Sequence, residues 1–441
     1  MPTVAFYTLG CKVNAYETEA MWQMFQRAGY QKVDFQQEAD VYLINTCTVT
    51  NTGDKKSRQI IRRAIRKNPD AVIAVTGCYA QTSPAEVLEI PGVDIVVGTQ
   101  GRERLLEYVD QVKKTREPIN QVGNIMKQRE FEEMDVPRFS ERTRASLKIQ
   151  DGCNNFCTFC IIPWAKGLSR SRKPENVLEQ ARKLVDAGYQ EIVLTGIHTG
   201  GYGEDLENYR LADLLWDLDR IEGLNRIRIS SIEASQIDER VIEVLNASKK
   251  MCRHLHIPIQ SGDDTILRRM RRKYTVDEYR DKILRLHEAM PDVAITTDVI
   301  VGFPGETDEQ FRNSYQLIES LGMYQLHVFP YSKRSGTPAA KMPDQVPNEI
   351  KHQRVEQMIQ LSKKLQRKYA EKFVGKVLEV IPEKPFHEEQ RDLLVGYSDN
   401  YLQVVFQADP SVIGKICRVR LEEAGTEHSF GTFEEVAVSA N

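Results

Sequence analysis

The feature that most constrains the fold is an alternation of short apolar runs with amphipathic segments, which occurs twice. In the first third of the chain the runs are VAFYTL, DVYLINT, AVIAVTG and DIVVG, with helix-like segments at 15–28, 54–67 and 84–90. Strands that alternate with helices form a parallel sheet. Further runs lie near 145–149, 190–195, 226–231, 253–258, 293–301 and 324–330. This second set predicts a partial (β/α) barrel, with fewer strands than the eight that close a full one.

The end of the chain has a different pattern. Residues 347–372 carry apolar side chains at helical spacing, which predicts one long helix across the barrel. After Gly375, short alternating runs broken by turn residues predict a small antiparallel β-barrel: VLEVIPE, LLVGYSD, YLQVVFQ, KICRVRLEEAG and EEVAVS. A polar stretch with two prolines separates the two βα regions and is interpreted as a linker. The predicted domains are 1–113, 139–369 and 372–437, with the linker at 114–138.

Composition excludes several classes of protein. The 441 residues are 41% hydrophobic with a net charge of -3, which is unlike a disordered or fibrous chain. No run approaches the roughly 18 apolar residues of a membrane span, and MPTVAFYTLG lacks the regions of a secretory signal, so we expect a cytoplasmic protein without membrane contact. Eight cysteines are too few for a disulfide framework, and in a reducing compartment such cysteines more often bind metal or do chemistry.

Three cysteines each follow one strand of the first predicted sheet. Cys11, Cys47 and Cys78, here called the first triad, come within a few residues of the ends of the first three strands. Parallel sheets carry their ligands at the carboxyl ends of the strands, so these residues can converge although they are far apart in sequence. The alternative is three unrelated buried cysteines.

The second triad is compact. Cys153, Cys157 and Cys160 lie in DGCNNFCTFC, directly after the apolar run SLKIQ. Three thiolates can bind three irons of a 4Fe-4S cube and leave the fourth iron open. Structural zinc is the alternative, but it normally needs a fourth Cys or His, and Cys252 and His254 are far along the chain.

The CxxxCxxC spacing after the first strand of a six-strand βα pattern, with an aromatic residue before the last cysteine, resembles the radical S-adenosylmethionine (SAM) enzymes. The resemblance implies that the open iron chelates the amino and carboxylate groups of SAM. One electron from the cluster then cleaves the sulfonium to a 5′-deoxyadenosyl radical. The protein would supply orientation, burial and exclusion of water.

Further motifs narrow the resemblance to the methylthiotransferases: TLGCKVNAYETEAM, INTCTVTNTGDKKSRQ, VTGCYAQ, TGIHTGGYG, HLHIPIQSGDDTILRRMRRKYT, TTDVIVGFPGET and FPYSKRSGTPAA. That family implies a flavodoxin-like N-terminal domain whose first triad binds an auxiliary 4Fe-4S cluster, a barrel whose second triad binds the radical cluster, and a small TRAM domain that contacts RNA. One SAM methylates sulfur on the auxiliary cluster, and a second yields the radical that activates a C–H bond of the substrate.

Other positions are weaker candidates for the SAM site. Thr195 and Gly196 begin TGIHTGGYG after the second barrel strand, Ser231 and Glu233 follow the third, and Gln260 follows HLHIPI. They could bind the methionine end and the ribose of SAM. The alternatives are a simple glycine turn and a solvated loop. His254 and His256 are interpreted as packing residues, and Cys252 and Cys417 as buried cysteines without a role.

Charge favours a nucleic acid partner. Residues 54–67 carry a net charge of +6, residues 141–173 carry +5, and RRMRRK adds five cations at 268–273. Such runs suit a polyphosphate such as RNA, although solvated helix faces are the alternative. Residues 374–441, in contrast, carry a net charge of -6. RNA contact by that domain is therefore a hypothesis that would need a local face such as Lys415, Arg418 and Arg420.

Within the family, LGCKVNAYE, INTCTVTNTGD, CNNFCTFCIIPW and SSIEAS look closest to the branch that modifies N6-threonylcarbamoyladenosine in the anticodon loop of tRNA. The substrate carboxylate would need a cation, and Lys166, Arg170 and Arg172 are the candidates. Lys166 stands where the family pattern suggests Arg, which puts bidentate binding there in doubt. Alternatives are the branches acting on isopentenyladenosine or on a ribosomal-protein aspartate, and a non-catalytic iron-sulfur or zinc RNA-binding redox sensor. We also expect a flavodoxin- or ferredoxin-type electron donor and a monomer.

Overall fold

The computed structural model describes residues 1–49, 51–136, 138–139, 143–388 and 391–437. The chain divides into two compact units. Unit 1 comprises Met1–Phe139, Lys148–Lys173 and Ser332–Lys341, and unit 2 comprises Ser140–Leu147, Pro174–Tyr331 and Met342–Asn441. The second cysteine triad therefore shares a unit with the first, whereas most of the barrel belongs to the other unit.

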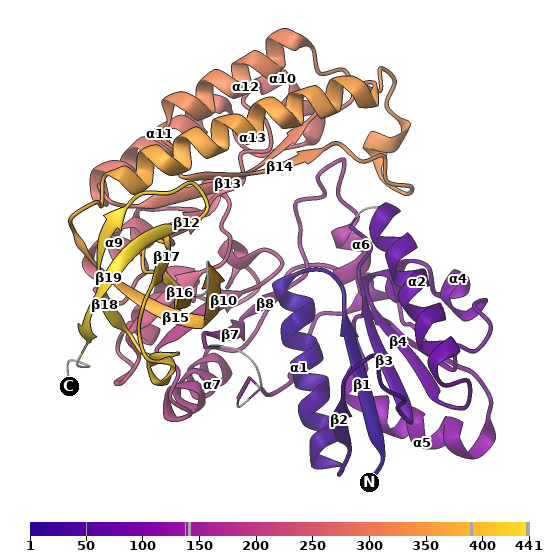
Figure 1. Ribbon diagram of the computed structural model, residues 1–441. Helices are drawn as coiled ribbons and strands as arrows, with labels where there is room; N and C mark the ends of the chain where they lie inside the picture. Colours follow the sequence, from indigo (N-terminus) through magenta and orange to yellow (C-terminus); the bar gives the residue numbers. More distant parts are fainter. Residues whose placement is uncertain (50, 137, 140–142, 389–390, 438–441) are drawn as a thin grey trace. The chain divides into compact units, whose positions relative to one another are not determined.

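Unit 1 is built on a six-stranded sheet of order β2-β1-β3-β4-β5-β6, in which neighbouring strands are parallel (Figure 1). The strands are β1 (Thr3–Thr8), β2 (Gln31–Val33), β3 (Val41–Thr46), β4 (Val72–Gly77), β5 (Ile95–Val97) and β6 (Ile119–Gln121). The first five have the order of flavodoxin-like sheets, which confirms the predicted fold class.

Helices cover both faces of this sheet. Side chains of α1 (Lys12–Arg27) and α5 (Leu105–Thr115) pack in one apolar cluster, which includes Phe25 and Val109. Side chains of α2 (Asn51–Lys67), α3 (Cys78–Thr82) and α4 (Pro84–Leu88) pack in a second cluster with the other faces of β3 and β4. The strands β3 and β4 are buried at every position, as expected for the central strands of a three-layer domain.

The segment predicted as a linker contributes to the sheet. Within 114–138, β6 adds a sixth strand beside β5, and a short 3-10 turn, η2 (Ile125–Lys127), follows it. Ile119 packs in the apolar cluster of α5, while the next two residues of β6 are exposed. A three-residue strand with one buried side chain is too short to give the alternating pattern by which strands are recognised.

Unit 2 contains the partial barrel. Its strands are β7 (Ala145–Lys148), β10 (Glu191–Thr195), β11 (Arg226–Ile229), β12 (His254–His256), β13 (Ala294–Val301) and β14 (Gln325–Pro330). They form the runs β7-β10-β11 and β12-β13-β14, and a parallel bridge between Ile227 and Met251 joins the two. The connecting helices are α7 (Pro174–Asp186), α8 (Leu211–Asp219), α9 (Glu239–Ala247), α10 (Asp264–Met270), α11 (Val276–Ala289) and α12 (Asp308–Ser320). The predicted barrel of six strands is confirmed.

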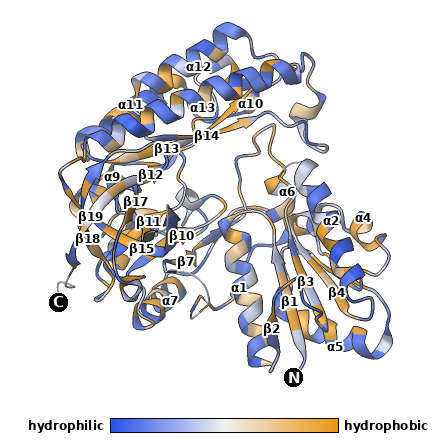
Figure 2. Ribbon diagram, viewed as in Figure 1, coloured by the Kyte–Doolittle hydropathy of each residue, from blue (hydrophilic) through white to orange (hydrophobic). Residues whose placement is uncertain are grey.

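The long predicted helix is α13 (Asn348–Glu371), which packs beside α12 and β14 (Figure 1). Met358, Leu361, Leu365 and Tyr369 are buried, whereas Ile359 is 39% exposed. Figure 2 shows that most of α12 and α13 is hydrophilic, as expected of helices with a single buried face.

The C-terminal strands close into a barrel of order β15-β16-β17-β19-β18. They are β15 (Val377–Glu388), β16 (Arg391–Ser398), β17 (Gln403–Phe406), β18 (Cys417–Glu423) and β19 (Ser429–Val436). The small β-barrel is confirmed, but its last strand begins earlier than the run EEVAVS at 434–439 indicates, and 438–439 lie outside the described residues.

A buried carboxylate attaches this small barrel to the partial barrel. Glu191 is fully buried and accepts a hydrogen bond of 2.6 Å from Nε of Arg228. The same guanidinium donates to the backbone oxygens of Ser398 and Asp399, both at 3.1 Å. Burial alone would raise the pKa of Glu191, but Arg228 and Arg144 lower that pKa to about 2. The pair is therefore charged and holds the turn after β16 in place.

No described helix combines the length and the apolar character that crossing a bilayer requires.

Candidate functional site

The first triad lies at one edge of the sheet of unit 1. The strands β1, β3 and β4 are neighbours, and Thr46 at the end of β3 pairs with Gly77 at the end of β4. Cys47 and Cys78 come directly after these paired residues, and Cys11 is the N-cap of α1, just beyond β1. The structure thus brings the three cysteines to the same carboxyl edge, and their role as ligands stays a prediction.

Two glycines allow this close approach. Gly10 has φ +104°, and a Cβ there would lie 3.0 Å from Cβ and 3.2 Å from Sγ of Cys47. Gly77 has φ +95°, and a Cβ would lie 2.5 Å from the backbone oxygen of Thr46. Any other residue at these positions would push the cysteine loops apart.

The thiols of the first triad have a graded exposure. Cys11 is exposed, Cys47 is half-buried and Cys78 is buried. Burial raises the pKa of Cys47, and the neighbouring Cys11 raises it further. Burial also raises the pKa of Cys78, an effect that Lys166 opposes and that Cys11 and Cys47 reinforce. A shared cluster would need the three sulfurs close together, and the position of the three cysteines at one sheet edge agrees with this.

The second triad occupies a compact loop after β8 (Gln150–Asp151). The N–H of Cys153 donates to the Gly167 oxygen at 3.0 Å, and the N–H of Asn155 points at Sγ of Cys153 at 3.5 Å. The N–H of Cys160 donates to the Cys157 oxygen at 3.0 Å. This turn keeps the three cysteines of the loop close together.

Each triad offers the three thiol donors that a 4Fe-4S cube with one open iron needs, and its role as a cluster site stays a prediction. Each offers three cysteines with no fourth protein ligand predicted, and the described residues form no disulfide. Among the residues that the structure describes, no three Cys, His, Asp or Glu side chains are grouped to hold a single metal ion. A cube differs from such a site because each thiolate binds a different iron.

In the second loop, Gly152 has φ +72° and a Cβ there would overlap the carbonyl of Leu168, so the backbone is folded closely around the loop.

The three cations predicted to bind the substrate carboxylate are paired inside unit 1. Nζ of Lys166 donates to both carboxylate oxygens of Glu17, at 2.8 and 2.9 Å. Arg170 lies 3.8 Å from the Asp151 carboxylate, and Nε of Arg172 donates to Glu133 at 2.7 Å. All three cations are buried. Contact with substrate would require these pairs to open, so that role stays a prediction.

The predicted SAM residues lie in unit 2, at the carboxyl ends of neighbouring barrel strands. Thr195 ends β10, and Gly196 follows it. Ser231 and Glu233 follow β11. Gln260, beyond β12, adopts φ +64°, and its N–H donates to the Asp298 oxygen of β13 at 2.9 Å. Their common edge is where barrels of this kind bind ligands, and the assignment to SAM stays a prediction.

The carboxylate of Glu233 is held by a neighbouring arginine. It forms an ion pair with Arg272, and burial raises the pKa of its carboxyl although Arg272 opposes that shift. A carboxylate fixed in this way could accept hydrogen bonds from ribose hydroxyls without reorienting.

The histidines pack as the sequence indicates. His254 stacks on Tyr401 with the ring centroids 4.1 Å apart. His256 bonds Thr296 at 2.9 Å and lies 3.3 Å from the Asp298 carboxylate. Cys252 and Cys417 are buried.

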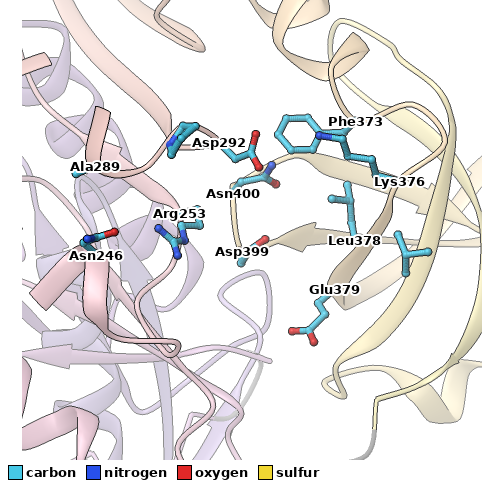
Figure 3. A pocket seen from close by; sticks show the side chains of 12 residues that line it. Asn246, Arg253, Ala289, Asp292, Phe373, Lys376, Leu378, Glu379, Asp399 and Asn400 are labelled. Atoms are coloured by element: carbon cyan, nitrogen blue, oxygen red, sulfur yellow. The ribbon is translucent and has the colours of Figure 1, made fainter. Parts of the chain in front are cut away.

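A cavity of about 570 Å³ lies at the other end of the partial barrel (Figure 3). Figure 3 shows residues that precede β12 and β13 facing residues of the small barrel: Asn246, Arg253, Ala289 and Asp292 on one side, Phe373, Lys376, Leu378 and Glu379 on the other. It holds charges of both signs and no cysteine. Because it borders the amino ends of the strands, it is separate from the predicted SAM residues.

The basic runs differ in exposure. In α2 the side chains of Lys55, Lys56, Arg62, Arg63, Arg66 and Lys67 are exposed. In the run 141–173, by contrast, Lys148, Lys166, Arg170 and Arg172 are buried. In the small barrel Arg418 pairs with Glu435 and Arg420 with Glu434, at 2.9 and 2.6 Å. Among the described residues, exposed cations near the first triad therefore include Lys55 and Lys56 at the start of α2 and Lys12, which follows Cys11.

Two family models match the chain: one described as the Radical SAM superfamily matches residues 147–318, and one described as Uncharacterized protein family UPF0004 matches residues 3–98. The chain is 63% identical over 438 residues to the threonylcarbamoyladenosine tRNA methylthiotransferase MtaB of Bacillus subtilis, covering 99% of this chain and 97% of that protein. It is 35% identical to the tRNA-2-methylthio-N(6)-dimethylallyladenosine synthase of the same organism, covering 95% of this chain and 83% of that protein.

Among solved structures, the chain is similar to the radical S-adenosylmethionine methyltransferase TsrM of Kitasatospora setae, determined with cobalamin and a [4Fe-4S] cluster bound. The TM-score is 0.58 at 16% identity, covering 77% of this chain and 74% of that one. At this identity the likeness concerns the fold alone, and it agrees with a parallel-sheet domain joined to a partial barrel.

Proposed function

We infer the function of this chain from its family, because it belongs to the methylthiotransferases of the radical SAM superfamily. It is an enzyme of that class, and the class implies a 4Fe-4S cluster and SAM. We propose that it converts N6-threonylcarbamoyladenosine in the anticodon loop of tRNA to the 2-methylthio derivative. The observation that carries this proposal is the 63% identity, over nearly the whole chain, to a relative named for that nucleoside.

We propose that the second triad holds the radical cluster and the first triad an auxiliary 4Fe-4S cluster. When bound, the radical cluster with SAM supplies a 5′-deoxyadenosyl radical, and the auxiliary cluster supplies the sulfur of the methylthio group, whose methyl comes from a further SAM. In the overall change the C2–H bond of adenosine is replaced by a C2–S bond, and the hydrogen leaves in 5′-deoxyadenosine. The convergence of Cys11, Cys47 and Cys78 at one sheet edge supports the second cluster.

The protein's own contribution is orientation and charge. In our proposal the turn around Cys153, Cys157 and Cys160 supplies three ligands, and the fourth iron is left open for SAM. We propose that Thr195, Gly196, Ser231, Glu233 and Gln260, which lie at the carboxyl edge of the partial barrel, bind SAM. An anticodon-loop base is already single-stranded, so exposing its C2 edge costs only a few kcal/mol of unstacking.

The partner in this proposal is tRNA, with the exposed cations at the start of α2 as the contact with phosphate. Arg418 and Arg420 of the small barrel's predicted RNA face are both in ion pairs. Among the described ion pairs, none includes Lys415, the third cation of that face. RNA contact by this TRAM-like domain therefore rests on the family resemblance. We further propose a flavodoxin- or ferredoxin-type electron donor and a monomeric enzyme.

The test uses the anaerobically reconstituted, dithionite-reduced protein with SAM and tRNA that carries either N6-threonylcarbamoyladenosine or N6-isopentenyladenosine. We expect the methylthio product only from the first tRNA. Product from the second alone would move the enzyme to the other tRNA branch, and turnover with neither would direct attention to a ribosomal-protein aspartate. Absence of 5′-deoxyadenosine would favour a redox sensor instead.

Replacing each triad assigns the clusters. Roughly eight irons per chain are expected for the parent and about four for either triple Cys→Ala variant. Loss of Cys153, Cys157 and Cys160 should abolish release of 5′-deoxyadenosine, whereas loss of the first triad should spare it and abolish only methylthiolation. If the variant that lacks Cys11, Cys47 and Cys78 keeps all the iron of the parent, the first triad binds no cluster.

A further inference from the structure

A buried ion network in unit 1 joins the helix that follows Cys11 to the helix that follows Cys160. Its members, here called the buried network, are Glu17, Arg102, Glu132, Lys148, Asp151, Lys166 and Arg170. Glu17 is the centre: one of its carboxylate oxygens accepts from Lys148 at 2.7 Å and from Lys166 at 2.8 Å. The other oxygen lies 2.6 Å from Nη1 of Arg102. All seven side chains are 6% exposed or less.

The charges of the buried network do not balance. Four cations, Arg102, Lys148, Lys166 and Arg170, face three carboxylates, Glu17, Glu132 and Asp151, which leaves one positive charge. The carboxylates raise the pKa of Lys166 although burial opposes them, so its ammonium stays charged. An unbalanced charge in the interior is strongly unfavourable unless an anion accompanies it. A neighbouring anion would therefore stabilise the buried network.

The first triad lies beside the buried network. Lys166 is the last residue of α6 (Ile162–Lys166), and α6 packs against α3, whose first residue is Cys78. A hydrogen bond of 2.6 Å from Oγ1 of Thr99, beyond β5, to the Ala165 oxygen fixes the end of α6 beside this edge of the sheet. Cys78 and Lys166 are both buried, so little water screens one from the other.

We propose that Lys166 is a positioning residue for the auxiliary cluster, with its ammonium offsetting the cluster's negative charge and Glu17 holding that ammonium beside Cys78. The inference rests on the proposed function in one respect, namely that the first triad binds a cluster. A cube bound by three thiolates is a net anion, and each electron it accepts makes it more negative. A fixed cation at its buried side therefore favours the reduced form and raises its reduction potential.

The sequence predicts that Lys166 contacts the substrate carboxylate, whereas the proposed role places its ammonium beside the auxiliary cluster. A substrate contact would leave the potential of the cluster unchanged when Lys166 is replaced and would change the discrimination between the two tRNA nucleosides. The two roles therefore have separate readouts.

The test measures the auxiliary cluster alone. In the full-length chain carrying Cys153→Ala, Cys157→Ala and Cys160→Ala, reconstituted anaerobically, the midpoint potential is determined by a redox titration followed by electron paramagnetic resonance. We expect Lys166→Gln to shift the potential to a more negative value, Lys166→Arg to keep it close to the parent, and Glu17→Gln to shift it to a more positive value. Iron content and thermal unfolding of each variant establish that the cluster and the fold are retained.

Opposite shifts for Lys166→Gln and Glu17→Gln are a pattern that a merely structural role does not produce. A potential of the Lys166→Gln variant equal to that of the parent, at full iron content, overturns the proposal. If Lys166→Gln does not retain its cluster, Glu17→Gln decides, and an unchanged or more negative potential overturns it. A parent that binds no iron after loss of the second triad refutes the auxiliary cluster itself, and that outcome is distinct from a failure of the role of Lys166.

Discussion

Lys166 donates hydrogen bonds to both carboxylate oxygens of Glu17, at 2.8 and 2.9 Å, across 149 positions of the chain. Glu17 lies on the helix that begins after Cys11, and Lys166 ends the helix that follows Cys160. The pair therefore ties together the segments that carry the two cysteine triads. Neither side chain has any exposed surface, so solvent does not compete with this contact.

Replacement of Glu17 by Ala should strongly destabilise unit 1. The change leaves Arg102, Lys148 and Lys166 buried without their shared carboxylate, a loss of about 3–5 kcal/mol in the free energy of unfolding. Urea denaturation at neutral pH measures it. The matched control is Glu107→Ala, whose side chain is 64% exposed and which should cost less than about 1 kcal/mol. Equal effects of the two changes would show that the buried network does not hold the fold.

The attachment of the small barrel should weaken in acid. The folded pKa of Glu191 is about 2, below the ordinary value of 4.5, so its stabilisation is complete above pH 4.5 and is lost as the pH falls toward 2. This difference corresponds to about 3 kcal/mol. The Glu191→Gln variant should lose that part of the acid dependence in denaturation measured at several pH values. Glu379→Gln, a change at a more exposed partner of Arg226, should keep it.

Gly77→Ala should disturb the first triad selectively. With φ +95° and a Cβ 2.5 Å from the Thr46 oxygen, the new side chain would displace the start of α3 and therefore Cys78. Reconstituted protein should hold about four irons per chain instead of about eight. Gly29→Ala is the control, because Gly29 also has a positive φ but nothing within 4 Å of its Cβ position. Full iron loading of Gly77→Ala would contradict the placement of the cluster.

The two ends of α2 should differ in their contribution to tRNA binding. Lys55 and Lys56 lie near the carboxyl edge of the sheet that carries Cys47, whereas Arg66 and Lys67 end the same helix and are equally exposed. Lys55→Ala with Lys56→Ala should weaken binding and lower the slope of log affinity against log salt by about 2. Arg66→Ala with Lys67→Ala should change both much less. Equal losses would mean that α2 attracts RNA only through its total charge.

The sequence predicted the order and the type of the long elements because their patterns are local. The helix α13 shows helical periodicity, and the strands β1, β3, β4 and β13 each have at least six residues and contain an apolar run bounded by other segments. The strands β2 and β6 were missed since each has three residues and little buried surface. Their pairing is decided by neighbours in space, not by their own pattern.

Some residues of the candidate site could be predicted from the sequence, and others could not. Cys11, Cys47 and Cys78 could be grouped in advance because parallel strands bring their ends together. The basic residues Lys166 and Arg170 were interpreted as ligands of substrate because a run of cations has no local sign of burial. Their partner carboxylates include Glu17, which in sequence looks like any charged residue of an amphipathic helix. Only the fold shows that it faces inward.

The most direct test of the central claim is mass spectrometry of the nucleosides in tRNA from a host strain with and without this gene. We expect N6-threonylcarbamoyladenosine without the methylthio group to accumulate in the deletion strain and the gene to restore its 2-methylthio form. Complementation with the Cys153→Ala variant should fail. If the methylthio form of this nucleoside is unchanged in the deletion strain, the proposed function is contradicted.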